Sequence, residues 1–391
     1  MAMRFGSLAR LVLGVSMLAL AACGERSGPP VTPAAVAEFT TLDFAAVDNY
    51  TAPTLPRYFD GTVAALDNSP ASNAIDDRVA TLGRVLFYDL RLSTNHRASC
   101  ASCHQQALGF TDSMRFSNGI STAATTDFHS MRLGNLRYWR PGTTFWDRRT
   151  ASVEAQASHP LHSLVEMGWG GAAGDTDDLI RKMSGIPYYP ELFAWAFGSP
   201  AITEPRIQQA LAQFIRAMVS SSSRWDQEYA QVFSPEVASR GLDLDLPNFT
   251  REENRGRHLF MTDVARGGAG CAACHLPPTF ALAANSRSNG LDAGETRLFK
   301  APSLRSVGLT GPHMHDGRFA TLAEVIDFYD RGVQDGPALD PRLRQGSRPQ
   351  RLNLSAGDRA ALVAFLMTLN DTALVKDARF SDPFRRRRLT N

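Results

Sequence analysis

The sequence lacks a strong excess of charge of either sign. Its 391 residues carry 41 Lys and Arg against 39 Asp and Glu, and 43% of them are hydrophobic. Nucleic-acid-binding proteins usually carry a marked basic excess, and disordered proteins combine high net charge with low apolar content. The composition therefore argues against both classes, and the length suits two to three domains with buried cores.

Long apolar runs are also scarce. The marked run, Leu11 to Ala22, has twelve residues, which is too short for a permanent membrane-spanning helix and fits the core of a signal peptide. It ends in Leu20-Ala21-Ala22-Cys23, which resembles the lipobox of bacterial lipoproteins. We therefore expect residues 1–22 to be removed, Cys23 to be acylated, and the protein to face the periplasm on a lipid anchor. An ordinary signal peptide that happens to carry a cysteine is the alternative.

The segments next to the two ends show no sustained helical periodicity. Residues 24–71 are rich in Pro, Ala, Thr and Asn. We expect residues 23–75 to form the acylated cysteine and a flexible tether. Residues 377–391 are expected to form a basic, solvated tail because they contain the run Arg385 to Arg388.

Cysteine is rare, and its few positions are informative. The chain has five cysteines. Apart from Cys23, the other four fall in two C-x-x-C-H motifs, Cys100-Ala101-Ser102-Cys103-His104 and Cys271-Ala272-Ala273-Cys274-His275. In this pattern two thiols bond the vinyl groups of a haem and the histidine ligates its iron. The sequence therefore predicts two covalently bound haem c groups, with His104 and His275 as iron ligands.

Other uses of these cysteines fit less well. The two pairs lie 171 residues apart, whereas a four-cysteine zinc site places its pairs about 15–20 residues apart. A thioredoxin-like dithiol needs a βαβ context, which the sequence does not suggest. Two disulfide bonds are compatible with export but would make no use of the adjacent histidines.

The two motifs belong to an internal repeat. Leu82-Gly83-Arg84-Val85-Leu86-Phe87 precedes the first motif, and Arg255-Gly256-Arg257-His258-Leu259-Phe260 precedes the second. Apolar periodicity predicts a helix in both places and another over 355–369, and Thr250 with Glu253 forms a capping-box pattern. We expect an all-α protein with two tandem class I-like cytochrome c domains, 76–245 and 246–376.

Further motifs occur in a fixed order along these domains: Leu86 to Ser93, Gly109 to Asp112, Phe145 to Arg149, Val165 to Gly168 and Met314 to Phe319. Together with the haem motifs, they resemble the bacterial di-haem cytochrome c peroxidase family, which includes the MauG-type enzymes. The resemblance covers roughly residues 76–376. It implies a haem peroxidase whose first domain holds the peroxide-reacting haem and whose second domain holds the electron-transfer haem.

The resemblance also implies three catalytic positions. Glu166 matches the family's distal acid-base carboxylate, and an apolar pocket raises a carboxyl pKa enough for proton transfer to peroxide. Gln156 matches a second pocket position that can hydrogen-bond peroxide. Trp146 matches the tryptophan between the haems, whose indole can relay an electron. A surface Glu, a surface Gln and a core Trp are the alternatives.

The axial ligand of the second haem distinguishes two branches of the family. Peroxidases proper place a methionine where this chain has Tyr329, fourteen residues after His315. MauG-type proteins resemble this chain in having a tyrosine there. A thioether stabilises ferrous iron, whereas a phenolate stabilises the higher oxidation states. The alternative is that Tyr329 packs in a helix and Met314 is the ligand.

Two further expectations rest on weaker likeness. In some family members a loop histidine near His129 caps the first haem at rest. The family also binds calcium between the haems, an ion that prefers oxygen ligands. Here Thr310 and Pro312 could offer backbone carbonyls, but residues 128–132 depart from the family pattern. Calcium therefore stays doubtful.

Three functions remain open from the sequence. The first is a peroxidase that reduces hydrogen peroxide with electrons from a small periplasmic cytochrome c or cupredoxin. The second is a MauG-like oxidase that uses peroxide to oxidise side chains of a partner protein. The third is an electron-transfer protein without a substrate. The lipid anchor would be the contact with the membrane, no nucleic-acid partner is expected, and a homodimer stays open.

Overall fold

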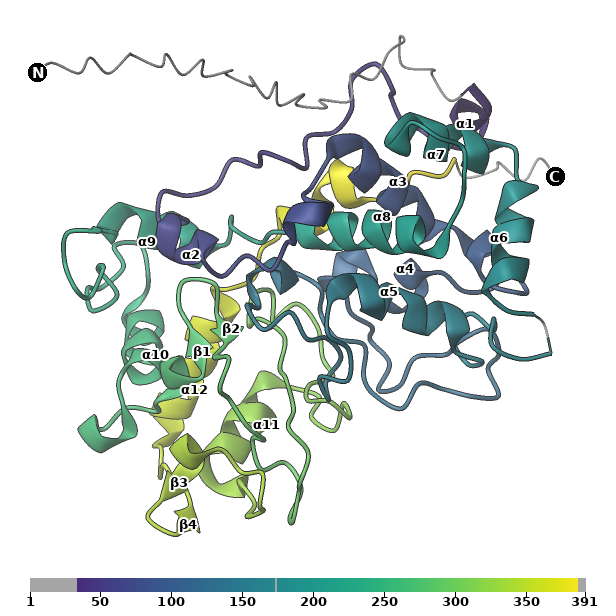
Figure 1. Cartoon of the computed structure of the whole chain (residues 1–391). Coiled ribbons are helices and arrows are strands. Elements are labelled where there is room, and N and C mark those ends of the chain that lie inside the picture. Colours follow the sequence, from purple (N-terminus) through teal and green to yellow (C-terminus); the bar gives the residue numbers. More distant parts are fainter. Residues whose placement is uncertain (1–33, 173, 386–391) are drawn as a thin grey trace, which may run out of the picture. The chain divides into compact units, whose positions relative to one another are not determined.

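The computed structural model describes residues 34–172 and 174–385. The expected signal peptide, the expected lipid-modified Cys23 and the arginines from position 386 onward lie outside this part. Within the described residues, none of the helices is long and apolar enough to cross a membrane. The described chain is mainly helical, and the sequence-based expectation of a helical protein is confirmed (Figure 1).

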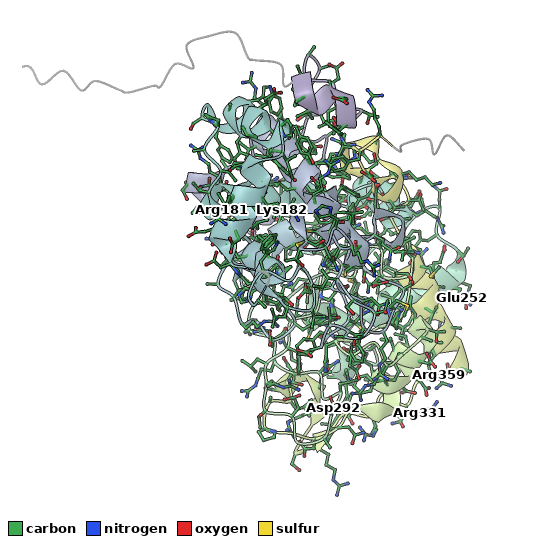
Figure 2. The ribbon with its side chains drawn as sticks, turned by 90° about the vertical axis from the view of Figure 1, so that its right-hand side faces the viewer. Arg181, Lys182, Glu252, Asp292, Arg331 and Arg359 are labelled. Carbon is green, nitrogen blue, oxygen red and sulfur yellow. The ribbon has the colours of Figure 1, made fainter. Side chains whose placement is uncertain are left out.

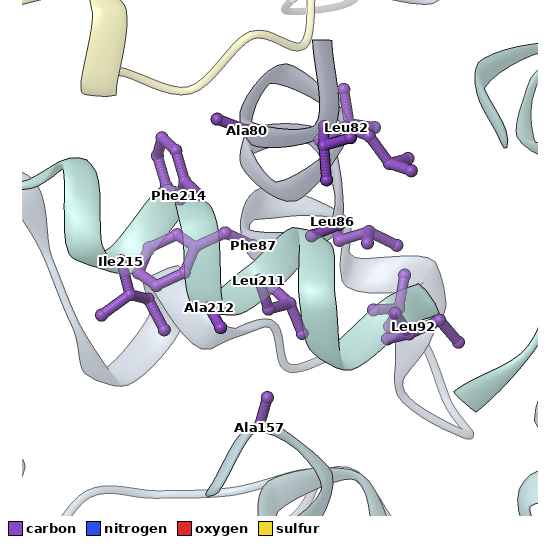
Figure 3. Packing of buried hydrophobic residues seen from close by; sticks show 14 of the residues in the cluster. Ala80, Leu82, Leu86, Phe87, Leu92, Ala157, Leu211, Ala212, Phe214 and Ile215 are labelled. Carbon is purple, nitrogen blue, oxygen red and sulfur yellow. The ribbon is translucent and has the colours of Figure 1, made fainter. Parts of the chain in front are cut away.

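A first core forms around two crossing helices, α3 (Asp77–Tyr88) and α8 (Glu204–Ala217). The Asp76 carboxylate caps α3 by accepting from two backbone N–H groups, and Thr203 caps α8. Leu82, Leu86 and Phe87 belong to this buried cluster, and the Phe87 ring centroid lies 5.4 Å from that of Phe214 on α8 (Figure 3). Four helices complete this half: α4 (Cys100–Cys103), α5 (Val153–His162), α6 (Thr176–Ser184) and α7 (Tyr188–Phe197).

A second core repeats this plan with α10 (Arg251–Met261) and α12 (Ala356–Met367). Thr250 and Glu253 form the expected capping box, and Ser355 caps α12. The predicted apolar stripe of α12 is buried in this core. The other helices here are α9 (Arg224–Val232) and α11 (Leu322–Asp327), which continues into a π-helical turn, η7 (Phe328–Gly332).

Short elements connect these helices. Two antiparallel pairs of two-residue strands form, β1 (His275–Leu276) with β2 (Ala281–Leu282) and β3 (Arg344–Gln345) with β4 (Arg348–Pro349). Single 3₁₀ turns are η1 (Ala71–Asn73), η2 (Leu90–Leu92), η3 (Gln106–Leu108), η4 (Leu136–Tyr138), η5 (Val264–Arg266), η6 (Cys271–Ala273), η8 (Pro341–Leu343), η9 (Leu374–Lys376) and η10 (Ala378–Phe380).

The repeated glycine of the sequence marks the closest approach within each helix pair. A Cβ atom on Gly83 would lie 2.0 Å from the Ala210 carbonyl oxygen of α8. A Cβ atom on Gly256 would lie 1.8 Å from the Ala361 carbonyl oxygen of α12. These separations are far below van der Waals contact with backbone that cannot move aside. Glycine is therefore required at both crossings by packing, although neither residue has a positive φ.

The N-terminal stretch differs from the flexible tether that the sequence suggested. Residues 34–75 include α1 (Ala34–Phe39) and α2 (Gly61–Ala64), and they pack on both cores. Tyr50 is buried in the first core and donates to the Arg379 carbonyl at 2.7 Å, while Tyr58 is buried in the second and donates to Asp226. Buried anchors at irregular spacing leave no periodic signal, so the sequence pattern concealed this packing.

The C-terminal stretch and the boundary between the halves also differ from expectation. Phe380 belongs to the first core, and the Arg84 guanidinium donates to the Ala378 and Ser381 carbonyls at 2.7 Å each. Residues 377–385 are therefore packed rather than a solvated tail. Trp225 on α9 belongs to the second core. The change of core thus occurs before α9, about twenty residues ahead of the boundary expected at 245.

Charged side chains lie mostly on the outside. Arg181 and Arg331 are 75% and 62% exposed and pair with carboxylates three and four residues away, and Figure 2 shows both at the surface. Such exposed pairs contribute little to stability, about 0–1 kcal/mol each. The fold therefore depends mainly on the two apolar cores.

We predict that Gly256→Ala lowers the free energy of unfolding by about 3 kcal/mol, because the new methyl group overlaps the α12 backbone. Gly83→Ala should behave alike at the other crossing. Gly357→Ala, on α12 with its nearest neighbour 3.8 Å away, is the matched control and should be neutral or stabilising by up to about 1 kcal/mol. Guanidinium unfolding of the purified protein measures all three. Equal stability of Gly256→Ala and the control would contradict the close crossing.

Candidate functional site

The first C-x-x-C-H motif forms one helical turn that opens with a reciprocal Ser99–Ser102 cap. His104 follows directly, and its Nδ1 lies 3.0 Å from the Phe110 carbonyl oxygen. A carbonyl can only accept, so Nδ1 carries the proton and Nε2 keeps its lone pair. Burial also lowers the pKa of His104 and keeps the ring neutral. The residue thus presents a neutral nitrogen of fixed orientation, as a metal ligand must.

The second motif lines a cavity of about 340 Å³. Cys271 lies in η6, and His275 begins β1. The four motif cysteines form no disulfide bonds within the described residues. Burial lowers the pKa of His275 to about 4, and its Nδ1 has no hydrogen-bond partner within the described residues. A largely apolar cavity with two thiols and a neutral imidazole in its wall fits a covalently attached haem in size and in donor chemistry.

Tyr329 and Met314, the two candidate ligands of the second haem, share Asn289 as a neighbour. The Asn289 amide nitrogen lies 3.3 Å from the Tyr329 hydroxyl and 3.6 Å from the Met314 sulfur, and all three residues line the cavity. Tyr329 projects from the π-helical turn η7, a geometry that is frequent at functional sites. Burial raises the pKa of its phenol to about 12. The structure thus brings both side chains to the same region of the wall.

Trp146 lies where the two halves meet. Its indole N–H donates to the His129 carbonyl at 2.7 Å, and its backbone carbonyl accepts from the Lys300 N–H at 2.6 Å. Trp146 lines the cavity of the second motif, and its ring centroid lies 6.3 Å from that of His315. Residues of both halves therefore hold the indole, as a residue between two redox centres requires.

His129 engages both of its ring nitrogens with neighbouring loop residues. It is buried, with Nδ1 3.0 Å from the Met114 carbonyl and Nε2 3.2 Å from the Thr111 hydroxyl. Thr111 follows Phe110, which accepts from His104. The histidine thus braces the loop that orients His104 and, through its carbonyl, Trp146. Whether His129 also caps the first haem stays a prediction.

Glu166 lies in a loop beyond α5 that neighbouring loops hold by backbone hydrogen bonds. The Val165 carbonyl accepts from Ile120 at 2.9 Å, and the Met167 carbonyl accepts from Thr94 at 3.0 Å. Burial raises the pKa of the Glu166 carboxyl, and Arg149 partly opposes this rise. Burial raises the pKa of the Cys100 and Cys103 thiols, and the nearby Glu166 charge adds to the rise. The carboxyl is therefore close enough to the first motif to act on it electrostatically.

Gln156 lies on α5, one turn before Pro160, and α5 ends shortly before the Glu166 loop. Its backbone N–H donates to the Ser152 carbonyl at 3.1 Å, and its side chain is half-buried. The contacts of this side chain do not assign it a function, so its place in a peroxide pocket stays a prediction.

The calcium site that the sequence left doubtful gains no support from the described residues. Within residues 34–172 and 174–385, no three or more His, Cys, Asp or Glu side chains gather as a metal-binding group. The Thr310 hydroxyl donates to the adjacent Gly311 carbonyl at 2.8 Å. Gly311 lies between Thr310 and Pro312, whose backbone carbonyls the sequence offered as calcium ligands.

Comparisons with known proteins agree with this geometry. The family model for di-haem cytochrome c peroxidase matches residues 77–232. The methylamine utilization protein MauG of Methylorubrum extorquens is 32% identical over 316 residues, which cover 77% of this chain and 80% of that protein. The cytochrome c551 peroxidase of Nitrosomonas europaea is 29% identical over 277 residues, covering 65% and 73%.

A solved structure extends the likeness to the fold. The crystal structure of a MauG-like protein associated with microbial copper homeostasis shares 31% sequence identity and a TM-score of 0.67, covering 85% of this chain and 99% of that one. The likeness thus spans both helical halves and both cysteine motifs. The chain belongs to the di-haem cytochrome c peroxidase family and is a haem-dependent oxidoreductase.

Proposed function

We propose that this protein is an exported peroxidase that reduces hydrogen peroxide at a haem on Cys100, Cys103 and His104. Electrons from a small periplasmic cytochrome c or cupredoxin would enter through a second haem on Cys271, Cys274 and His275. The observation that carries this proposal is the half-buried Glu166 carboxyl beside the first motif, whose pKa burial raises. The haems supply the redox chemistry when bound, and the chain supplies binding, orientation and proton transfer. Cys23, outside the described residues, would carry the lipid anchor.

Glu166 is the proposed acid-base residue. Peroxide reduction takes up two electrons and two protons and yields two water molecules, so a proton must move between the peroxide oxygens. A carboxyl whose pKa is raised by burial can accept a proton from one oxygen and return it to the other. Gln156 is proposed to hydrogen-bond the peroxide in the same pocket.

Trp146 is the proposed relay between the two haems. An indole is oxidised more readily than most side chains, and this one is fixed by contacts to both halves. Fixed placement matters because the rate of electron transfer falls steeply with distance. A relay in the wall of the cavity at the second motif shortens the distance that an electron must cross in one step.

Tyr329 is the proposed axial ligand of the second haem, with His275 on the other side. This ligand favours the alternative function, a MauG-like oxidase that stores oxidising equivalents for side chains of a partner protein, because a phenolate stabilises oxidised iron. A purely electron-transferring protein is the third candidate. Such a protein has no use for an acid with a raised pKa beside the first motif, and Glu166 therefore counts against it.

We predict that Glu166→Gln lowers peroxide turnover by about 100- to 10,000-fold, the contribution of general acid-base catalysis. Covalent haem content should stay unchanged, because the carboxyl is not an attachment residue. The exposed Glu252, labelled in Figure 2, gives the matched control Glu252→Gln, which should retain turnover. Stopped-flow assays with ferric protein measure both. Normal peroxide consumption by Glu166→Gln would rule out its acid-base function.

We predict that Tyr329→Phe changes the electron paramagnetic resonance spectrum of the ferric second haem, because it removes the phenol oxygen. Tyr329→Met should raise the midpoint potential of this haem, since a thioether stabilises ferrous iron. Met314→Leu should leave the spectrum unchanged. The reverse pattern, in which only Met314→Leu alters the spectrum, would identify Met314 as the ligand.

A peroxide pulse separates the two enzymatic functions. Peroxide is added to the ferric protein, followed by reduced cytochrome c, and both optical spectra are recorded. For the proposed peroxidase, we predict rapid oxidation of the cytochrome and immediate return of the enzyme to its ferric spectrum. A persistent oxidised spectrum that ignores the cytochrome would instead establish the MauG-like function.

A further inference from the structure

Lys300 is a buried cation that lacks an anionic partner within the described residues. It is 2% exposed, and its ammonium nitrogen donates to the Met131 sulfur at 3.3 Å. It also lies 5.6 Å from the centroid of the Trp139 ring. A thioether is a weak acceptor. Burial lowers the pKa of Lys300 to about 7, and its charged neighbour, Arg148, is also a cation.

Arg132, next to Met131, also lacks an anionic partner within the described residues. Its Nε is buried and has no hydrogen-bond partner among the residues that the structure describes. Burial lowers its pKa to about 10, and no carboxylate counteracts this effect. Arg132 and Lys300 both line the cavity that Cys271, Cys274 and His275 border. Two cations from different segments thus face one cavity. The carboxylates that also line it, Asp263 and Asp340, pair with Arg266 and Arg342 instead.

Elsewhere this fold pairs its buried cations. The fully buried Arg305 contacts Asp226 at 2.6 Å, and Arg216 donates two hydrogen bonds to the carboxylate of Glu154. Lys182, one of only three lysines in the sequence, satisfies its ammonium on the Ser93 carbonyl at 2.7 Å. Lys300 and Arg132 therefore differ from Arg305 and Arg216 in having no carboxylate partner within the described residues. Because an uncompensated buried charge is costly, an anion bound in the cavity would stabilise the charged forms of both side chains.

We propose that Lys300 and Arg132 form the anion site that binds the propionate carboxylates of the haem in this cavity. The propionates are the anionic side groups of a haem, and a lysine with an arginine is suited to a carboxylate. This inference rests on the proposed second haem, and it assigns a function to two residues that neither the motifs nor the axial ligands involve.

The position of the site ties it to electron transfer. The Lys300 backbone N–H donates to the Trp146 carbonyl at 2.6 Å, so the site adjoins the proposed relay. A positive charge beside a haem stabilises the added electron and offsets the charge of the propionate. The site therefore raises the reduction potential of the second haem.

The test uses the purified protein with both haems attached. Lys300→Met removes the charge at similar length, Lys300→Arg retains it, and Lys182→Met is the control on a lysine outside the cavity (Figure 2). Haem per chain is counted first. Optical redox titration then gives both midpoint potentials, and His275→Ala identifies the second haem by the transition it displaces. Resonance Raman spectra report the propionate bending band.

For Lys300→Met we expect the reduction equilibrium of the second haem to shift at least tenfold toward the oxidised form, which corresponds to about 59 mV. The propionate band should shift too, whereas Lys300→Arg and Lys182→Met should resemble the unmodified protein. Arg132→Met should act in the same direction and serves as the second variant if Lys300→Met fails to mature. An unchanged potential and an unchanged band in these charge-removing variants would overturn the anion site.

Failure of this inference differs from failure of the proposed function. A protein with two haems that shows the potential shift but does not reduce peroxide supports the anion site and contradicts the peroxidase. A protein that reduces peroxide but shows no shift supports the peroxidase and contradicts the anion site. A chain that carries no haem at Cys271 and Cys274 contradicts both.

Discussion

The close contact between two helices in each half is the constraint on which the rest of the structure depends. Gly83 and Gly256 let α3 and α10 approach the backbones of α8 and α12 without an intervening side chain. Each first helix then leads into the loop that carries a C-x-x-C-H motif. The arginine after each glycine is buried and binds backbone carbonyls of a flanking segment, Arg84 to residues 378–381 and Arg257 to Leu242. One packing rule thus sets the core and the motif position twice.

The flanking segments join the two halves more firmly than tandem domains on a linker would. Tyr50 and Tyr58 insert eight residues apart into different cores. Asp371, after α12, accepts from the backbone N–H groups of Ser221 and Ser222 at 2.9 Å each, where the chain passes from one half to the other. Such cross-connections restrict hinge motion, and the position of Trp146 between the halves is correspondingly fixed. A relay needs this property, since its distance to each redox centre sets the rate.

Much of the architecture was predictable because it rests on local pattern. The apolar face of α3, the capping box of α10 and the stripe of α12 follow from periodicity, and the cysteine motifs follow from their spacing. The segments 34–75 and 377–385 were missed because single anchors such as Tyr58 and Phe380 leave no period. The contacts of His129 and the exposed or buried state of Lys300 depend on residues far away in sequence. The choice between Tyr329 and Met314 stayed open since both reach Asn289.

The two ends of the described chain are paired with each other. Thr41 donates to the Pro383 carbonyl and Arg385 to the Phe39 carbonyl, each at 2.8 Å, so residues more than 340 positions apart form one antiparallel bridge. Contacts between residues so far apart in sequence form slowly, because the entropy cost of closing a long loop comes before the contact can stabilise the chain. Both cysteine motifs lie inside that loop. The topology therefore leaves an interval during folding in which the four thiols remain accessible, and closure of the ends completes the fold around whatever they have bound.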